Sequence, residues 1–543
     1  MNRKATAWVG GTTARFLTVF AVLLCLVGPW ILATPPSAGP DEPGHNVRAA
    51  AIVRGDLSGV EFFEGFNRRG YELPAHIGLP EPACFAFEPT QPASCLSDAP
   101  LPEGTAIRGS RASNYPVWGH VLPGIGSFAP AAVAPFASRF LDAVLPIALV
   151  ALAASVASRR GVLAVSAVLL ATTPMAMFSF AAVNPSGLAI AGGIGFWTAL
   201  YSYEPRRPMG RAAGTLLALS WAALVMPRRD GLIWGTLALS MAVLVSGIRL
   251  GDLWRSLGRW SRGTAVLATL AVLAWAGTSP LNGTNLLLAM PVLVIGAVFA
   301  RRGWERAAPR GPVAQGVLLT AGAGVALLAA TGVMTRRVGG FSTSPLVAIV
   351  SATGENLRQA IGSLGWLDTP VPTSMVMLWL IGLGALLGGA LGSDRRDGVL
   401  VAMATVIIGV GASWALAVAQ SDRFGANWQG RYYLPLLVGV PIVLGQTTRP
   451  WAGTRRLGLS VVGIAIIVLN VSLGALMRRF GVGTGGVLVP WRWDTFGAPV
   501  PLVALLLVHA LASVVLFVWV WNVPQASEPN QTGLTSGLAA GDL

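Results

Sequence analysis

The chain has 543 residues, of which 54% are hydrophobic and 11% are charged, and its mean hydropathy is +0.64. A soluble protein of this length needs far more charge on its surface, so the composition excludes a soluble globular protein and predicts a helical membrane protein. The formal net charge of +15 does not indicate nucleic acid binding, because the arginines cluster in short loops between apolar runs, where the positive-inside rule expects them.

The N-terminal segment predicts an uncleaved membrane helix with a cytoplasmic N-terminus. Arg3 and Arg15 precede FLTVFAVLLCLVGPWILATPP, which is long for a signal peptide and has no convincing small-residue cleavage site. A polar, Pro-rich outer loop, 35–117, follows. If this loop faces an oxidising exterior, Cys84 and Cys95 are expected to form a disulfide; the alternative is two free thiols.

Apolar runs continue to the end of the chain, and each can cross a hydrocarbon core of about 30 Å. The segment 114–136 is apolar but rich in proline, which favours an interfacial or re-entrant position. The sequence predicts about fourteen spans with both termini cytoplasmic, in one membrane domain, 1–522, followed by a disordered tail, 523–543. After the first helix, spans are expected near 139–158, 162–182, 184–203, 212–227, 231–248, 264–279, 285–300, 313–334, 374–392, 399–419, 433–447, 457–476 and 500–521.

Ionisable residues are almost absent from the middle of the predicted spans. Ion-coupled transporters usually carry an acid, His or Arg at that depth, so this distribution disfavours transport through the middle of the membrane. The polar residues that insertion does not explain collect in the predicted outer segments, including a second large outer loop, 335–373. Chemistry at the outer face fits this distribution better.

The segment PDEPGH places three candidate site residues at the start of the first outer loop. Two prolines stiffen the backbone around Asp41 and Glu42, and a helix that begins near Gly44 would put His45 on the same side as the acids. A carboxylate can accept the proton of an attacking hydroxyl. The alternative interpretation is a solvated acidic pair beside the membrane.

Basic and polar residues in other outer segments are candidates for binding a phosphate. Arginine binds phosphate oxygens through a planar, permanently charged fork. Arg431 in GRYYLP is the first candidate, although with Tyr432 it could only anchor a helix end at the interface. Asp368 in GWLDTP is as well explained by a helix cap as by a substrate contact. The remaining candidates in these segments are Arg228, Arg423 and Gln429.

Five segments carry a resemblance to a known family. PDEPGHNVRAAAIVRG, NYPVWGHVLPGIGS, TPMAMFSFAAVNPSG, GSLGWLDTPVP and NWQGRYYLPLL occur in the order typical of the bacterial membrane family called domain of unknown function 2142. The resemblance spans roughly 16–520. That family distantly resembles the GT-C glycosyltransferases, which include protein O-mannosyltransferases and aminoarabinose transferases.

The GT-C resemblance implies roles for individual residues. It implies a catalytic Asp or Asp-Glu pair early in the first outer loop, with Asp41 as general base and Glu42 as its helper or as the alternative base. It also implies basic residues at the outer face that bind the lipid phosphate. By its position in the outer segments, Arg431 is the best candidate for this role, and Arg228 and Arg423 are the next candidates. The family pattern has an acid after the Asn-Pro of FAAVNPSG, where this chain has Ser186 and Gly187.

The sequence therefore predicts an all-α, GT-C-like glycosyltransferase in the bacterial cytoplasmic membrane, with an active site that faces outward. Its predicted partners are membrane lipids, a polyprenyl-phosphate-linked sugar donor, and a glycan, lipid or protein acceptor, without nucleic acid. A lipid-linked glycan flippase or exporter, and a non-enzymatic assembly protein, are the alternatives. His76 and His120 show no metal-ligand spacing, so no cofactor is assigned, and a divalent cation stays open.

Overall fold

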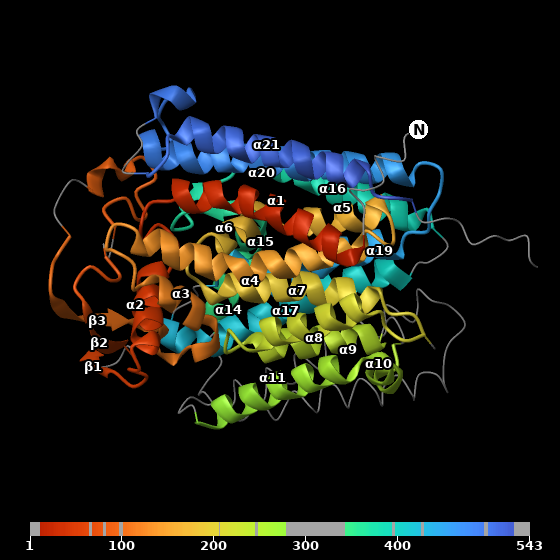
Figure 1. Cartoon of the computed structure of the whole chain (residues 1–543), viewed down its shortest axis with the longest axis horizontal. Helices are drawn as coiled ribbons and strands as arrows, with labels where there is room; N and C mark the ends of the chain where they lie inside the picture. Colours follow the sequence, from red (N-terminus) through yellow and green to blue (C-terminus); the bar gives the residue numbers. More distant parts are fainter. Residues whose placement is uncertain are drawn as a thin grey trace, which may run out of the picture.

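The computed structural model describes residues 11–63, 68–79, 83–96, 101–205, 207–244, 248–278, 343–393, 397–424, 428–493 and 498–525. This part of the chain is mostly helical, as predicted, and most of its strands lie at one end of a helical bundle (Figure 1). The predicted spans near 285–300 and 313–334 lie outside the described residues.

The long helices pack side by side along the longest dimension of the molecule (Figure 1). α1 packs against α4 and α21, α4 against α7, and α20 against α5 and α16. The longer helices are α1 (Thr12–Ala33), α2 (Glu42–Val53), α4 (Ala134–Ala157), α5 (Val162–Ala171), α7 (Pro185–Tyr201), α8 (Arg211–Val225), α9 (Gly231–Leu244), α11 (Arg259–Thr278), α15 (Thr353–Gly362), α16 (Thr373–Leu391), α17 (Asp397–Phe424), α20 (Thr454–Val482) and α21 (Leu502–Trp521). The shorter helices are α3 (Val121–Gly126), α6 (Pro174–Phe180), α10 (Leu250–Ser256), α14 (Thr343–Ser351), α18 (Leu434–Leu437) and α19 (Gly439–Thr447).

Fewer helices than expected are long enough to cross a membrane. Within the described residues, six helices are long and apolar enough: α1, α4, α16, α17, α20 and α21. α5 and α6 together would make a seventh, bent by 69°, because Pro174 starts a new helix that the Thr173 side chain caps. The predicted number of about fourteen is not reached here, since α8 and α9 have only 15 and 14 residues and a membrane needs about 20.

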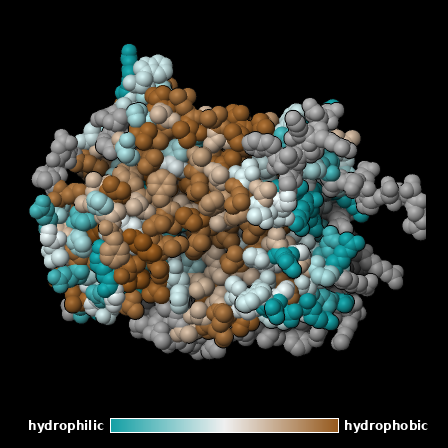
Figure 2. All heavy atoms as spheres, in the orientation of Figure 1, coloured by the Kyte–Doolittle hydropathy of each residue, from teal (hydrophilic) through white to brown (hydrophobic). Residues whose placement is uncertain are grey.

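The hydrophobic surface agrees with a membrane protein. Figure 2 shows a broad band of hydrophobic residues across the middle of the face in view and hydrophilic residues toward both ends. Many side chains of α21 that face away from the bundle are large and apolar, among them Leu507, Leu511 and Val514, which are 66%, 65% and 59% exposed. Exposed apolar residues on this scale are expected where lipid, not water, is the solvent.

The first loop folds into a small domain at one end of the bundle, which we call the sheet end. It carries an antiparallel sheet of β1 (Val60–Phe63), β2 (Arg68–Pro74) and β3 (Thr105–Ser110), in that order. The sheet packs on α2 through a small apolar core that includes Val47, Tyr71 and Leu73. α2 therefore lies between this sheet and the bundle, which fixes the position of its N-terminus (Figure 1).

The proline-rich segment 114–136 forms short helical turns on the surface at the sheet end. Its main element, α3, packs against α2 and α4. Val121, Ile125 and Phe128 are 40%, 49% and 61% exposed. Of the two positions expected from the sequence, exposed apolar side chains beside a polar domain fit the interfacial one better than a re-entrant one.

A few ionisable side chains lie inside the described spans, which agrees with the expectation that such residues are almost absent there, and the one in α21 is a histidine. His509 of α21 is fully buried, and its Nε2 accepts a hydrogen bond of 3.2 Å from the Trp30 indole. Its Nδ1 lies 3.0 Å from the Asn470 side-chain oxygen, so it donates there. The three side chains connect α1, α20 and α21, and a satisfied polar network of this kind holds helices together in lipid.

Cys84 and Cys95 are joined in a disulfide, with Cα atoms 6.2 Å apart. The loop between them lies over Arg479, which is fully buried and donates to the main-chain oxygens of Phe85 and Glu88 at 2.7 and 2.8 Å. The arginine thus holds the loop against the end of α20. The disulfide and the arginine act on the same short loop.

We expect peptide mapping of the non-reduced protein to find Cys84 linked to Cys95. Alkylation of the denatured protein before reduction should then modify Cys25 alone, because Cys25 is the free cysteine. Alkylation after reduction should add two further modifications. Modification of all three cysteines without reduction would contradict the disulfide.

Candidate functional site

Asp41 lies at the N-terminus of α2, as the sequence suggested. The helix begins at Glu42, and Asp41 has a left-handed backbone conformation (φ 62°), which Asp and Asn tolerate better than most residues. Its side chain makes no cap hydrogen bond to the helix. Half of the Asp41 side chain is exposed, so one carboxylate oxygen can meet a ligand.

Glu42 points the other way and is fully buried. Its two oxygens accept from the Arg139 Nε and Nη2 at 2.6 and 2.7 Å, and also from the main-chain N–H groups of Gly39 and Val183. Arg139 is also fully buried and donates to the Thr34 oxygen at 2.5 Å. The expectation that Glu42 assists in catalysis does not match these surroundings, because four hydrogen bonds already occupy its oxygens. Glu42 and Arg139 clamp α1, α2 and α4 together.

Arg431 reaches across the sheet end to Asp41. Its Nη2 donates to Asp41 Oδ2 at 2.6 Å, and the arginine side chain is only 3% exposed. Its Nε and Nη1 have no hydrogen-bond partner among the described residues, and neither does the buried Nε1 of Trp428. Such buried donors are costly to leave unpaired, and since no described residue accepts from them, this group of N–H donors could bind the oxygens of a ligand.

Arg228 lies beside Arg431 but is already neutralised. It donates to both carboxylate oxygens of Asp230, at 2.8 and 3.0 Å, and to the Ser186 hydroxyl at 2.7 Å. Burial opposes its charge, but Asp230 outweighs burial and raises the Arg228 pKa; burial likewise opposes the charge of Asp230, whose pKa the arginine lowers. Both guanidinium groups lie close to the Tyr432 ring, with their Cζ atoms 4.6 Å (Arg228) and 5.1 Å (Arg431) from its centroid.

The departure from the family pattern at Ser186 and Gly187 has a structural explanation in this chain. Ser186 accepts a hydrogen bond from Arg228, whose carboxylate partner is Asp230. A Cβ atom on Gly187 would lie 2.4 Å from the main-chain oxygen of Ser179, so no side chain fits there. Asp230 thus supplies the acid that Arg228 needs.

His45 and His120 form a buried pair next to these groups. His45 Nδ1 lies 3.0 Å from His120 Nε2, and the Tyr115 ring contacts His45 edge-on with centroids 5.1 Å apart. Burial lowers the pKa of both histidines, that of His120 to about 4 and that of His45 well below its usual value, helped by His120, Arg431 and Arg228. Burial, with smaller effects from nearby carboxylates including Asp41, raises the pKa of Tyr115 to about 12. All three side chains are therefore uncharged at neutral pH.

The other predicted site residues differ in their surroundings. Gln429 lies next to the Arg431 turn, and its buried side-chain oxygen has no partner among the described residues. Asp368 accepts from the buried Arg479 at 3.0 Å, in the hairpin of β4 (Ser363–Leu364) and β5 (Thr369–Pro370). This contact is structural and 
favours neither a helix cap nor a substrate contact. The Arg423 side chain lies outside the described residues.

A metal site does not fit these residues. Within the described part of the chain, no group of three or more His, Cys, Asp and Glu side chains lies close enough to hold an ion. Asp41, Glu42 and Asp230 have arginine partners, and among the described residues no carboxylate forms a ligand set with the histidine pair.

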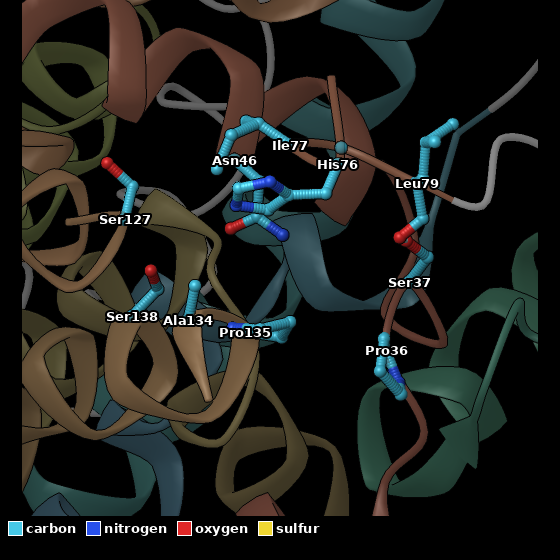
Figure 3. A pocket seen from close by; sticks show the side chains of 11 residues that line it. Pro36, Ser37, Asn46, His76, Ile77, Leu79, Ser127, Ala134, Pro135 and Ser138 are labelled. Carbon is cyan, nitrogen blue, oxygen red and sulfur yellow. The ribbon is translucent and has the colours of Figure 1, made fainter. Parts of the chain in front are cut away.

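A small pocket lies on another side of the first loop (Figure 3). Its cavity volume of about 30 Å³ has room for one or two water molecules. Asn46, His76, Ser127 and Ser138 supply its polar lining, and none of the predicted phosphate-binding arginines lines it. It is a water-sized space and not the candidate site.

Sequence reasoning missed Arg139, Tyr115, His120 and Asp230 as members of this region. His120 and Tyr115 belong to NYPVWGH, which carried part of the family resemblance, and Asp230 follows Arg228 in PRRDG. The sequence therefore contained both segments, but His120 was considered there only as a metal ligand. Its partner His45 lies 75 residues away in the chain, so only the fold reveals the pair.

Comparison with known proteins identifies a family but no function. The model of a family described as predicted membrane protein (DUF2142) matches residues 24–440. No curated protein matches the chain. No solved structure matches it either.

Proposed function

The chain belongs to the DUF2142 family of predicted membrane proteins, and we propose that it is a cell-envelope glycosyltransferase. It moves a sugar from a polyprenyl-phosphate-linked donor to a hydroxyl group of a glycan, lipid or protein. The observation that carries the proposal is the half-exposed carboxylate of Asp41 beside the unpaired buried donors of Arg431 and Trp428. The proposal also rests on the GT-C resemblance, which is an analogy.

The arginines supply the phosphate-binding half of the site. Arg228 is fully engaged by Asp230 and Ser186, so the free binding capacity lies on Arg431, whose Nε and Nη1 are unpaired. The ring of Tyr432 holds both guanidinium groups in place. A phosphate that binds Arg431 would satisfy donors that the described residues leave without acceptors, through charge-assisted hydrogen bonds.

Asp41 is the base in this scheme. The acceptor oxygen attacks the anomeric carbon of the donor as the bond from that carbon to the phosphate oxygen breaks, and the bonding electrons leave with the polyprenyl phosphate. The proton of the acceptor hydroxyl passes to Asp41. Arg431 stabilises the leaving phosphate. A single displacement of this kind inverts the anomeric configuration.

The proposed location is the outer face of the bacterial cytoplasmic membrane. The opposite end of the bundle carries Arg159 and Arg211 near the start of α1, and positive charge of this kind favours the cytoplasmic side. The sheet end, which holds Asp41 and the disulfide, then faces outward. A disulfide fits an oxidising exterior.

One observation favours the alternative of a lipid-linked glycan exporter. The bend of 69° between α5 and α6 interrupts a membrane span, and interrupted helices are common at the binding sites of transporters. An exporter would use Arg431 to bind the phosphate but would not need Asp41 as a base. A substitution of Asp41 that removes its basicity therefore distinguishes the two proposals.

We expect deletion of the gene to remove one sugar from the envelope glycans, and the wild-type gene to restore it. Arg431→Gln should fail to restore it, because losing charge-assisted hydrogen bonds of about 1.5–3 kcal/mol weakens phosphate binding about 10- to 150-fold. Arg431→Lys should restore it only in part, since lysine keeps the charge but not the planar fork. Glycan composition analysis at equal protein levels measures both.

Arg358→Gln is the matched control. Arg358 pairs with Glu355 on α15, one turn away along the same helix, and its side chain is 33% exposed. This variant should restore the sugar fully. An unchanged glycan profile in the deletion strain, or full restoration by Arg431→Gln, would contradict the proposal.

A further inference from the structure

The hydrogen bonds of the histidine pair determine where its protons lie. A carbonyl oxygen only accepts, so His120 Nδ1, 3.1 Å from the Pro116 oxygen, carries a proton. Because His120 is neutral, its Nε2 then has a lone pair and accepts from His45 Nδ1 at 3.0 Å. His45 is neutral as well, so its own Nε2 has no proton. The Pro116 oxygen thus sets the tautomer of His45 through His120.

His45 Nε2 is consequently a hydrogen-bond acceptor without a donor. No hydrogen bond to this atom occurs among the described residues, although the side chain is only 2% exposed. The ring lies against Tyr115, in the field of Arg431 and Arg228. Asp41 is one helical turn before His45, and its main-chain oxygen accepts a hydrogen bond of 3.2 Å from the His45 main-chain N–H.

The site therefore has two chemically different halves. On one side, Arg431 and Trp428 offer N–H donors that have no acceptor. On the other side, the free oxygen of Asp41 and the Nε2 of His45 are acceptors that have no donor. A phosphate supplies only acceptors, since its oxygens carry no proton when fully ionised, whereas a sugar hydroxyl can donate.

We infer that His45 accepts a hydrogen bond from a sugar hydroxyl of the donor, and that His120 is the positioning residue that holds it in the accepting tautomer. The inference rests on the proposed function and adds to it the orientation of the ligand, with phosphate toward Arg431 and sugar toward Asp41 and His45. A neutral imidazole with a fixed lone pair cannot bind a phosphate oxygen, because both groups are acceptors. It therefore distinguishes a glycosylated lipid phosphate from the bare lipid phosphate that remains after transfer.

Binding of two kinds of probe to the full chain in nanodiscs tests the inference. The first is farnesyl phosphate, and the second is farnesyl phosphate that carries mannose, glucose or arabinose. The wild type should bind at least one sugar-bearing probe more tightly than farnesyl phosphate. His45→Phe should lower the affinity for that sugar-bearing probe about three- to tenfold, which is the contribution of one hydrogen bond. It should leave the affinity for farnesyl phosphate unchanged within about twofold.

Two variants of His120 separate positioning from general damage to the fold. His120→Phe removes the acceptor for His45 Nδ1, so it should lose the preference for the sugar-bearing probe in the same way. His120→Gln offers an amide oxygen to His45 and an amide N–H to Pro116, so it should retain the preference. If His45→Phe does not fold, this pair of variants carries the test, because both keep His45 itself.

The outcomes distinguish the inference from the proposed function. A wild type that binds neither kind of probe contradicts the proposed function and the inference with it. Equal binding of both kinds by the wild type, or an unchanged preference in His45→Phe, overturns the inference alone. Equal weakening of both kinds by His45→Phe overturns it too, because the histidine would then support the whole site and not the sugar.

Discussion

Glu42→Ala should lower the free energy of unfolding by about 3–5 kcal/mol. The change removes one member of a fully buried ion pair and leaves Arg139 charged, without a carboxylate, inside the protein. It also leaves two main-chain N–H groups, of Gly39 and Val183, without their acceptor. The loss should appear as a lower midpoint of thermal unfolding in detergent and a lower yield of folded protein in membranes.

Two further variants should lose less stability than Glu42→Ala. Glu42→Gln retains the shape and one acceptor oxygen but not the charge, so it should destabilise less than Glu42→Ala. Glu204→Ala removes an acid whose partner Arg207 is 78% exposed, and an exposed pair of this kind contributes at most about 1 kcal/mol. A Glu42→Ala protein that is as stable as the wild type but inactive would contradict the structural role and restore Glu42 as a candidate catalytic group.

The two adjacent acids illustrate what sequence reasoning can and cannot reach. The proline-bounded acids after the first helix indicated a special position, and both acids do have specific arginine partners. Adjacent side chains at a helix start point in different directions, so one acid was expected to face a ligand and the other to support it. Which acid does which depends on Arg139 and Arg431, and the latter is 390 residues from Asp41 in the chain. Sequence spacing carries no information about such contacts.

The fold also has features that the sequence predicts and features that it does not. Hydrophobic runs predicted the position of the longer helices of the bundle, though not of α10, α14 or α15, because the length and apolar character of a span are local properties. The bend between α5 and α6 and the shortness of α8 and α9 depend on how neighbouring helices pack, so run length alone does not determine how many of the described helices cross the membrane. The three-stranded sheet of the first loop was not expected at all, since its short strands lie among Pro, Gly and charged residues.

The candidate site combines parts from both ends of the chain. α2 contributes Asp41 and His45, the first loop contributes His120, and the segment after α17 contributes Arg431. Arg431 connects phosphate binding with the position of the proposed base, because the same guanidinium group that would bind phosphate also holds Asp41. A phosphate on the unpaired Nε and Nη1 of Arg431 would therefore lie next to Asp41, which the Nη2 of the same side chain holds.

Asp41→Asn should reduce sugar transfer by about 10²- to 10⁴-fold, the usual contribution of a general base. The substitution keeps the size of the side chain and an oxygen that can accept from Arg431, but an amide cannot take a proton. Asparagine also tolerates the left-handed backbone at this position and still accepts from Arg431, so the fold should be retained. Transfer of radiolabelled sugar in membranes at matched protein levels measures the effect.

Glu72→Gln provides the control, because Glu72 is an exposed acid of the same loop, on β2, whose contact to Thr105 is also exposed. It should leave transfer unchanged. The Asp41 result also decides between the proposals: an enzyme loses its activity, whereas an exporter that only binds phosphate through Arg431 keeps moving its lipid-linked glycan. If Asp41→Asn transfers sugar at the wild-type rate, the carboxylate is only the ion-pair partner of Arg431. The outer acids would then no longer favour a transferase, while the unpaired donors of Arg431 would still favour a phosphate site.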